Sequence, residues 1–173
     1  AQVSEVPIIN AGDGAGQHPT QALLDVITIQ KEIGQIDGIK IAMVGDLANG
    51  RTVRSLCYLL SKFDGVKIYF VAPDVVPIGA DIKDYLKENG VEFKEDQDFE
   101  RVAREVDVVY QTRIQKERFK SEKEYKKYKG CYKIDNEAVK KMKAKAIIMH
   151  HLPRVDELAQ VLEPIIVVLV ARC

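Results

Sequence analysis

The chain has 173 residues, 46% of them hydrophobic, and its 26 Lys and Arg residues balance 26 Asp and Glu residues. This length predicts one domain with a substantial core, and zero net charge gives no electrostatic reason to expect nucleic acid or an anionic membrane as a partner. Cys57, Cys131 and Cys173 are widely spaced, which indicates neither a disulfide framework nor a zinc site. We therefore expect no metal and no cofactor. No apolar run reaches membrane length and no signal-peptide pattern opens the chain, so we expect a cytoplasmic protein.

Apolar periodicity predicts strands that alternate with helices. We predict strands at residues 39–44, 66–71, 91–93, 108–110 and 146–149. We predict helices at residues 19–33, 51–63, 81–89, 99–106, 136–143 and 155–162. Residues 6–10 are strand-like, as though a further segment preceded them, and residues 165–170 are typical of a strand or a packed apolar tail.

The alternation predicts an α/β fold with a doubly wound (Rossmann-like) parallel sheet of about five strands and helices on both faces. We expect residues 1–173 to form a single domain. In such sheets ligands bind beyond the carboxyl ends of the strands, so the residues that follow each predicted strand are the candidate site residues.

The first candidate is a glycine-rich loop that leads into a helix with His18 and Gln21 in its opening turn. Helix N-termini present unpaired N–H groups, which suit an anionic or carbonyl-bearing ligand. His18 is placed to polarise a carbonyl and Gln21 to hold an amide or amine. The alternative interpretation makes both ordinary polar groups of a helix start, with Gln21 as a capping residue. A dinucleotide loop fits less well, because the glycines read GxGxG and not GxGxxG.

The second candidate is Gly45-Asp-Leu-Ala-Asn-Gly-Arg-Thr52, which follows a strand and opens a helix. It differs from a Walker A loop by Arg51 in place of Lys, and Asp46 would bring a carboxylate among the phosphates. A guanidinium at a helix N-terminus suits bidentate capture of a carboxylate. The alternative is a solvated or salt-bridged Arg51.

The third candidate follows the strand at residues 108–110. Arg113 and Gln115 share one face of extended backbone, so both would point at an acidic ligand. The alternative is a plain polar loop. Two arginines, Arg51 and Arg113, at two strand ends on the ligand side of one sheet indicate a dicarboxylate site.

The last candidate is His150-His151-Leu152-Pro153 at the end of the strand at residues 146–149. Adjacent histidines in extended backbone face opposite sides, which argues against joint metal ligation. A break at Leu152-Pro153 would aim a backbone carbonyl into the cleft. The alternative for His150 is a packed histidine at a strand end. His151, Pro153 and Thr52 are further candidates for contact with a ligand.

Four segments in this order resemble the aspartate carbamoyltransferase family, in the carboxy-terminal, aspartate-binding half of its catalytic chain. They are Gln-His18-Pro-Thr-Gln21, Val-Gly-Asp-Leu-Ala-Asn-Gly-Arg51-Thr-Val, Thr-Arg113-Ile-Gln115-Lys-Glu-Arg and His-Leu-Pro-Arg154-Val-Asp-Glu. The resemblance covers residues 1 to about 158. It implies transfer of the carbamoyl group of carbamoyl phosphate to L-aspartate, which yields N-carbamoyl-L-aspartate and phosphate in pyrimidine biosynthesis.

The resemblance also implies roles for these residues. His18 would hydrogen-bond the carbamoyl oxygen and Gln21 would hold the carbamoyl nitrogen. Arg51, Arg113 and Gln115 would bind the two carboxylates of aspartate, and the Leu152 carbonyl would orient the amine. The related ornithine enzyme fits less well, because a positively charged substrate side chain needs no clamp of Arg113 and Gln115.

The chain departs from the family pattern in three places. His151 stands where the family usually has proline. The phosphate loop and a lysine lent by a neighbouring subunit belong to an N-terminal carbamoyl-phosphate domain, which we expect to be absent here. The residues after Leu158 no longer resemble the family. We therefore expect an aspartate carbamoyltransferase that is inactive without its N-terminal half. The alternatives are a catalytically inert aspartate-binding fragment and a P-loop-like nucleotide-binding domain.

The family further implies a homotrimer in the full enzyme, with a regulatory chain as a further candidate partner. In the family the Lys-rich segment at residues 116–129 corresponds to a loop that closes over aspartate. We expect this segment to be the least ordered part of the unliganded protein.

Overall fold

The computed structural model describes residues 6–14, 16–114, 122, 125, 128, 130–151, 158–159 and 166–170. Its helices are α1 (Pro19–Ile33), α2 (Arg51–Leu60), α3 (Ala80–Glu88), α4 (Phe99–Ala103) and α6 (Asn136–Lys140). Its strands are β1 (Lys40–Val44), β2 (Lys67–Val71), β3 (Glu92–Asp96), β4 (Val108–Gln111), β5 (Ile147–His151) and β6 (Ile166–Val170). Within these described residues, no helix has the length and apolar character that a membrane crossing requires.

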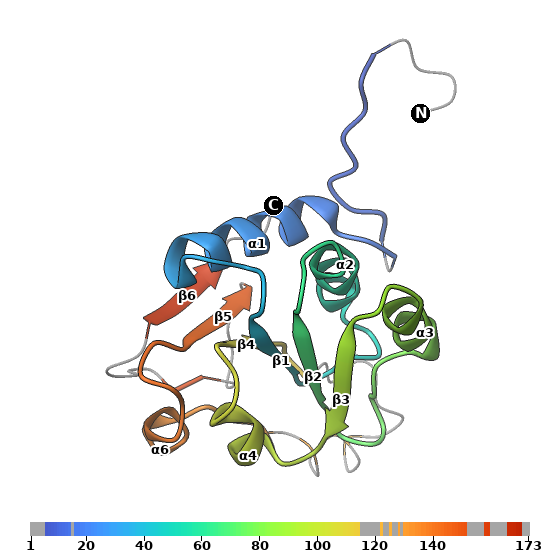
Figure 1. The fold of residues 1–173 in the computed structure, drawn as a ribbon. Coiled ribbons are helices and arrows are strands. Elements are labelled where there is room, and N and C mark those ends of the chain that lie inside the picture. Colours follow the sequence, from blue (N-terminus) through green and yellow to red (C-terminus); the bar gives the residue numbers. More distant parts are fainter. Residues whose placement is uncertain are drawn as a thin grey trace.

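The strands form one parallel sheet in the order β3-β2-β1-β4-β5-β6 (Figure 1). The predicted doubly wound sheet is confirmed. It has six strands, because the apolar segment near the end of the chain pairs with β5 as an edge strand. The strand order reverses between β1 and β4, so their carboxyl ends form the topological switch point at which such sheets bind ligands.

Helices cover both faces of the sheet. Figure 1 shows α1, α2 and α3 on one face and α4 and α6 on the other. Side chains alternate between the two faces along β1: Ile41 and Met43 join the core under α1 and α2, whereas Ala42 and Val44 join the core under α4 and α6. Because both faces are buried, the strands read as continuous apolar runs, which is why the sequence reveals them.

Several helices end earlier than predicted. The α2 helix ends at Leu60; the Ser61 N–H makes a last helical bond to Cys57 O, and the next residues close tighter turns, with Lys62 N–H donating to Leu59 O and Phe63 N–H to Leu60 O. In the same way, α4 ends at Ala103 and a turn continues to Glu105, whose N–H donates to Val102 O. The apolar residues beyond these ends still pack on the core, so the predicted periodicity extended past the helix.

Other boundaries were wrong for different reasons. The β3 strand extends further than predicted. Its last residues are charged and so lack the apolar pattern used for the prediction, but an edge strand tolerates such residues. Residues 6–10 form no strand. Where a helix was predicted at residues 155–162, Leu158 instead bridges Ile134, and the rest of that prediction, apart from Ala159, lies outside the described residues. The β5 strand continues through His150 and His151, which therefore belong to the sheet.

Candidate active site

The ends of β1 and β4 are held together at the switch point. Thr112 donates its N–H and its Oγ1 hydroxyl to the carbonyl of Val44, over 2.7 and 2.9 Å. The contact leaves no room for a side chain at Gly45, because a Cβ there would lie 2.4 Å from the Thr112 carbonyl oxygen. Gly45 also has a φ of 116°, which disfavours other residues. Arg113, half-buried, therefore leaves the sheet from a fixed position.

The loop between β1 and α2 is closed on itself. A phosphate-binding loop needs several backbone N–H groups directed at the ligand. Here Asp46 instead accepts from the N–H and the side-chain amide of Asn49, over 3.0 to 3.1 Å. The other N–H groups of this loop with protein acceptors are those of Gly45 (to Val71), Leu47 and Ala48 (both to Val76) and Arg51 (to Asn49). The predicted nucleotide-binding alternative therefore does not fit.

Arg51 is the first residue of α2, and its guanidinium reaches the glycine-rich loop that precedes α1. Its Nη1 donates to the carbonyl of Gly14 over 2.6 Å. A Cβ on Gly12 would lie 3.6 Å from the same nitrogen. The guanidinium is thus held by the backbone of another segment. The first two candidate segments, the glycine-rich loop before α1 and the loop before α2, are therefore in direct contact.

His18 is the N-cap residue of α1 and is 3% exposed. Its backbone N–H donates to Ser55 Oγ over 2.8 Å, and the same hydroxyl donates to Gln17 Oε1 over 2.6 Å. On the ring, Nδ1 lies 3.5 Å from the hydroxyl of Thr20. Ser55 was missed by sequence reasoning, although it lies one turn after Arg51 on α2 and is a buried polar residue on an amphipathic helix.

Gln21 is fully buried and does not cap the helix. Its Nε2 donates to Asp25 Oδ1 over 3.0 Å, and no side chain caps the start of α1, so the capping interpretation is wrong. The other carboxylate oxygen of Asp25 accepts from the Tyr110 hydroxyl over 2.9 Å. This buried chain of hydrogen bonds joins the first turns of α1 to β4. Asp25 and Tyr110 were not predicted, although an Asp four residues after Gln21 on an apolar helical face was a usable signal.

Burial decides the protonation of this network. Desolvation raises the pKa of Asp25 to about 6, although the hydrogen bonds from Gln21 and Tyr110 lower it. Burial, together with the nearby Asp25 charge, raises the pKa of Tyr110 well above its usual value of 10. At neutral pH Asp25 is therefore an ionised acceptor and Tyr110 a donor. Thr52, also buried, hydrogen-bonds the Tyr110 hydroxyl.

The two histidines of the last candidate, His150 and His151, end β5. His150 pairs in register with Gln111 and is 1% exposed, in agreement with the alternative of a packed histidine. The His151 ring stacks on Tyr110 with a centroid distance of 6.0 Å. Among the residues with described positions, no cluster of three His, Cys, Asp or Glu side chains is arranged to hold a metal.

Three predicted site residues, Gln115, Leu152 and Pro153, lie outside the described residues. So does most of the segment at residues 116–129, and with it the prediction about its order.

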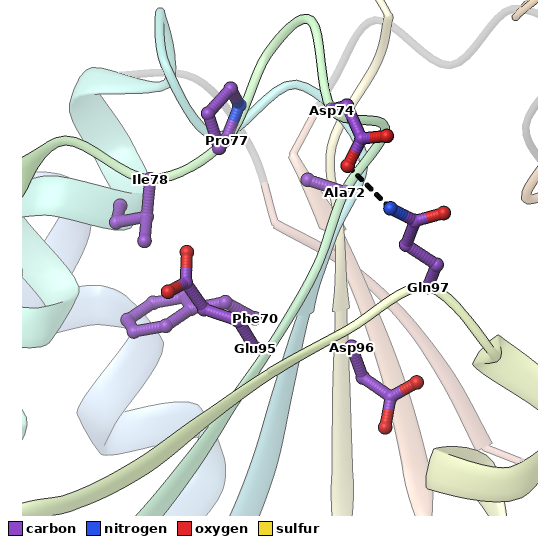
Figure 2. Close-up of a pocket in the computed structure, with 8 residues that line it drawn as sticks. All are labelled: Phe70, Ala72, Asp74, Pro77, Ile78, Glu95, Asp96 and Gln97. Carbon is purple, nitrogen blue, oxygen red and sulfur yellow. Dashed lines mark hydrogen bonds between the residues drawn. The ribbon is translucent and has the colours of Figure 1, made fainter.

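A cleft of about 340 Å³ opens at the carboxyl ends of β2 and β3 (Figure 2). It is lined by Phe70, Ala72, Asp74, Pro77, Ile78, Glu95, Asp96 and Gln97. Its three carboxylates are engaged, since Asp74 accepts from Gln97, Asp96 pairs with Arg101 and Glu95 pairs with Lys83. The lining offers a dicarboxylate no arginine or lysine and includes none of the predicted site residues, so the cleft is not the predicted site.

Comparison with known proteins assigns two segments. Residues 37–163 match the family described as aspartate/ornithine carbamoyltransferase, Asp/Orn binding domain. Residues 1–31 match the carbamoyl-P binding domain of the same family, which differs from the expectation that the whole resemblance lies in the aspartate-binding half. The division separates the candidate residues, because His18 and Gln21 fall in one match and Arg51 and Arg113 in the other.

Individual proteins agree with this result. A chloroplastic aspartate carbamoyltransferase of Arabidopsis thaliana is 60% identical over 159 residues, which are 91% of this chain and 41% of that protein. The solved catalytic subunit of M. jannaschii aspartate transcarbamoylase is 55% identical, with a TM-score of 0.85 over 92% of this chain and 51% of the other. Aspartate transcarbamoylase from Trypanosoma cruzi, solved with N-(phosphonacetyl)-L-aspartic acid, is 42% identical, with a TM-score of 0.82 over 92% of this chain and 52% of that one. The chain thus spans about half the length of these relatives, or less.

Proposed function

The chain belongs to the aspartate/ornithine carbamoyltransferase family, and we propose that it supplies the aspartate-binding part of an aspartate carbamoyltransferase. The reaction joins L-aspartate to the carbamoyl group of carbamoyl phosphate and releases N-carbamoyl-L-aspartate and phosphate, a step of pyrimidine biosynthesis. The relatives reported above are named for aspartate and none for ornithine. Two arginines near the switch point favour the same choice, because they attract a dicarboxylate and repel the ammonium group of ornithine.

The observation that carries this proposal is the contact between the two substrate-specific segments. Arg51, from the Asp/Orn-binding match, donates to Gly14, from the carbamoyl-P-binding match. Ser55 and Tyr110 make the same connection to His18 and, through Asp25, to Gln21. Groups suited to a carbamoyl carbonyl and groups suited to a carboxylate are therefore fixed side by side at the switch point.

His18 and Gln21 would act on the carbamoyl group. As the aspartate amine attacks the carbamoyl carbon, negative charge develops on the carbamoyl oxygen, and a donor held there stabilises the transition state more than the ground state. His18 is the proposed donor, at the positive end of α1. The Gln21 amide would accept a hydrogen bond from the carbamoyl NH₂ and so orient the carbon toward the amine.

Arg51 and Arg113 would bind aspartate, with Gln115 and the Leu152 carbonyl as further proposed contacts. Without ligand, the Arg51 guanidinium makes a hydrogen bond to a neutral carbonyl, that of Gly14. Aspartate would replace this bond by a charge-assisted, bidentate one, which is roughly twice as strong. The guanidinium is thus already near its proposed working position, and the exchange favours the substrate.

A carbamoyl-phosphate domain is the proposed structural partner. Among the described residues, five of the six exposed large hydrophobic side chains lie within the carbamoyl-P-binding match. They are Val6, Ile8, Ile9, Leu23 and Ile27. Exposed apolar side chains are typical of residues that pack against another domain, and we propose that the rest of the carbamoyl-phosphate domain covers these.

The test is a chimera in which residues 1–158 replace the matching segment of the M. jannaschii catalytic subunit. With carbamoyl phosphate and labelled aspartate, the chimera is expected to form labelled N-carbamoyl-L-aspartate, and His18→Ala is expected to lower kcat by roughly 10²–10³-fold. A chimera that melts cooperatively, as the native subunit does, yet forms no product would overturn the assignment.

The second candidate, an aspartate-binding domain without turnover, is tested with the 173-residue chain alone. We expect weak aspartate binding by calorimetry and no product, because the chain spans only 41% to 52% of the relatives compared above. Product formed by the chain alone would contradict the requirement for a further domain.

A further inference from the structure

Asp25 occupies an unusual position for a carboxylate. It is 0% exposed, and each of its oxygens accepts one hydrogen bond, from Gln21 Nε2 at 3.0 Å and from the Tyr110 hydroxyl at 2.9 Å. Both donors are 0% exposed as well. A buried carboxylate costs free energy, so a neutral side chain would be the simpler choice if only packing mattered.

The carboxylate selects one orientation of the Gln21 amide. A glutamine amide has a donor end and an acceptor end of nearly the same shape, whereas an ionised carboxylate only accepts hydrogen bonds. Nε2 must therefore face Asp25, and Oε1 is the end left for another group. Oε1 is buried and, among the residues whose positions are described, has no hydrogen-bond donor.

We propose that Asp25 is a positioning residue that fixes the polarity of the Gln21 amide, so that the carbamoyl group meets an acceptor and not a donor. This inference rests on the proposed function, in which Gln21 contacts the carbamoyl nitrogen. The carbamoyl group has an acceptor oxygen and a donor NH₂ of similar size. With His18 as donor at one end, only an acceptor at the other end distinguishes the two.

Tyr110 determines which atom of residue 25 faces Gln21. Its hydroxyl lies on β4 and donates to Asp25 Oδ2, which ties residue 25 to the sheet independently of Gln21. If residue 25 were asparagine, the Tyr110 hydroxyl would retain the oxygen as its acceptor. The asparagine NH₂ would then face Gln21, attract Oε1 and turn Nε2 toward the substrate.

This polarity gives the proposal a specificity test. Acetyl phosphate has a methyl group where carbamoyl phosphate has NH₂, so it leaves the buried Gln21 Oε1 without a donor. Sites built to hydrogen-bond a substrate NH reject an analogue that lacks it. In the chimera, Asp25→Asn is expected to lower kcat/KM for carbamoyl phosphate roughly 10–100-fold, the range for a buried polar group that loses its partner. The same variant should bind carbamoyl phosphate with a smaller preference over acetyl phosphate, measured with acetyl phosphate as a competing ligand. Its KM for aspartate should change little.

A compensating substitution separates polarity from general damage. In the double variant Gln21→Glu with Asp25→Asn, the amide NH₂ introduced at position 25 donates to one carboxylate oxygen introduced at position 21, and the other oxygen again presents an acceptor. We expect the double variant to exceed both single variants in kcat/KM. Asp107→Asn is the control, because Asp107 accepts from the Lys40 N–H at the amino ends of β1 and β4, away from the proposed site, and it should leave the carbamoyl phosphate KM unchanged.

The amide can also be observed directly, without activity. In the 173-residue chain, the Gln21 side-chain NH₂ signals in ¹⁵N NMR should show slow solvent exchange, and Asp25→Asn should shift them and speed the exchange. Unchanged signals would overturn the proposal, as would a double variant no better than the single ones. An inactive wild-type chimera would instead refute the proposed function, and the NMR result would still decide the orientation of Gln21.

Discussion

The buried carboxylate of Asp25 makes a specific prediction about stability and pH. Its pKa is about 6 in the folded protein, against 3.8 for an unperturbed Asp, mainly because burial disfavours the charged form. A folded-state pKa above the unfolded one means that the folded state binds more protons between these values. The contribution of Asp25 to stability is therefore fully present below pH 3.8 and is lost as the pH rises through 6. Above that pH this contribution no longer changes.

The size of the effect follows from the two pKa values. The difference of about 2.2 pKa units, at 1.36 kcal/mol each, gives about 3 kcal/mol in total. At pH 4 the carboxyl of Asp25 is already partly ionised in the unfolded state, so the loss of stability has begun. About 2–3 kcal/mol of it falls between pH 4 and pH 7.5. Asp25→Asn removes the titration but keeps the shape of the side chain. The wild type should lose this amount relative to the variant over that interval.

The assay is urea denaturation of both proteins at intervals from pH 4 to pH 7.5, with the difference in the free energy of unfolding plotted against pH. Tyr110 and Cys57 do not titrate in this window, since burial raises the pKa of Tyr110 far above it and that of Cys57 to about 12. A flat difference, or one that rises in favour of the wild type, would refute the reasoning.

Three further outcomes are expected. Gly45→Ala should destabilise the fold by more than about 3 kcal/mol in urea titrations, because it combines a strained φ with a clash against Thr112. The control, Gly90→Ala, has a positive φ but open space around it and should cost only about 1 kcal/mol. Equal losses of stability in the two variants would contradict the contact between Gly45 and Thr112. In the chimera, Arg51→Ala should raise KM for aspartate about 30–150-fold, the effect of losing a charge-assisted hydrogen bond of about 2–3 kcal/mol. Arg54→Ala, which removes another arginine of α2 and its partly exposed ion pair with Asp81 of α3, should not; a similar rise in both would count against Arg51 as the aspartate-binding residue. Calorimetry with Mg²⁺ and ATP should give no binding heat, and binding would revive the nucleotide alternative.

The sequence predicted the layered fold because both faces of the sheet are buried, which leaves apolar runs at β1, β2, β4 and β5 and amphipathic helices between them. It predicted β3 only in part, because an edge strand with charged residues lacks that pattern. The strand order could not be read at all, since it depends on which runs become neighbours in space.

Candidate site residues were recognisable where polar groups directly follow apolar runs, as with Arg51 and Arg113. Their partners were not. Ser55 and His18 are 37 residues apart, and Tyr110 and Asp25 are 85 apart. No periodicity connects such pairs, and Tyr110 at the end of an apolar run looks like an ordinary core residue. Asp25 was the one usable exception, because a carboxylate on a buried helical face requires a partner.

Helix α2 also has a mechanical consequence. It carries Arg51 in its first turn and Ser55 one turn later, and Ser55 holds the backbone of His18. A rigid shift of α2 against the sheet would move Arg51, the proposed carboxylate binder, and His18, the proposed carbonyl polariser, in the same direction. The separation of the two substrates would then stay nearly constant while the domain fluctuates. Since a misplacement of about 1 Å can cost about 10²-fold in rate, this shared attachment would protect the proposed alignment of amine and carbonyl from thermal motion.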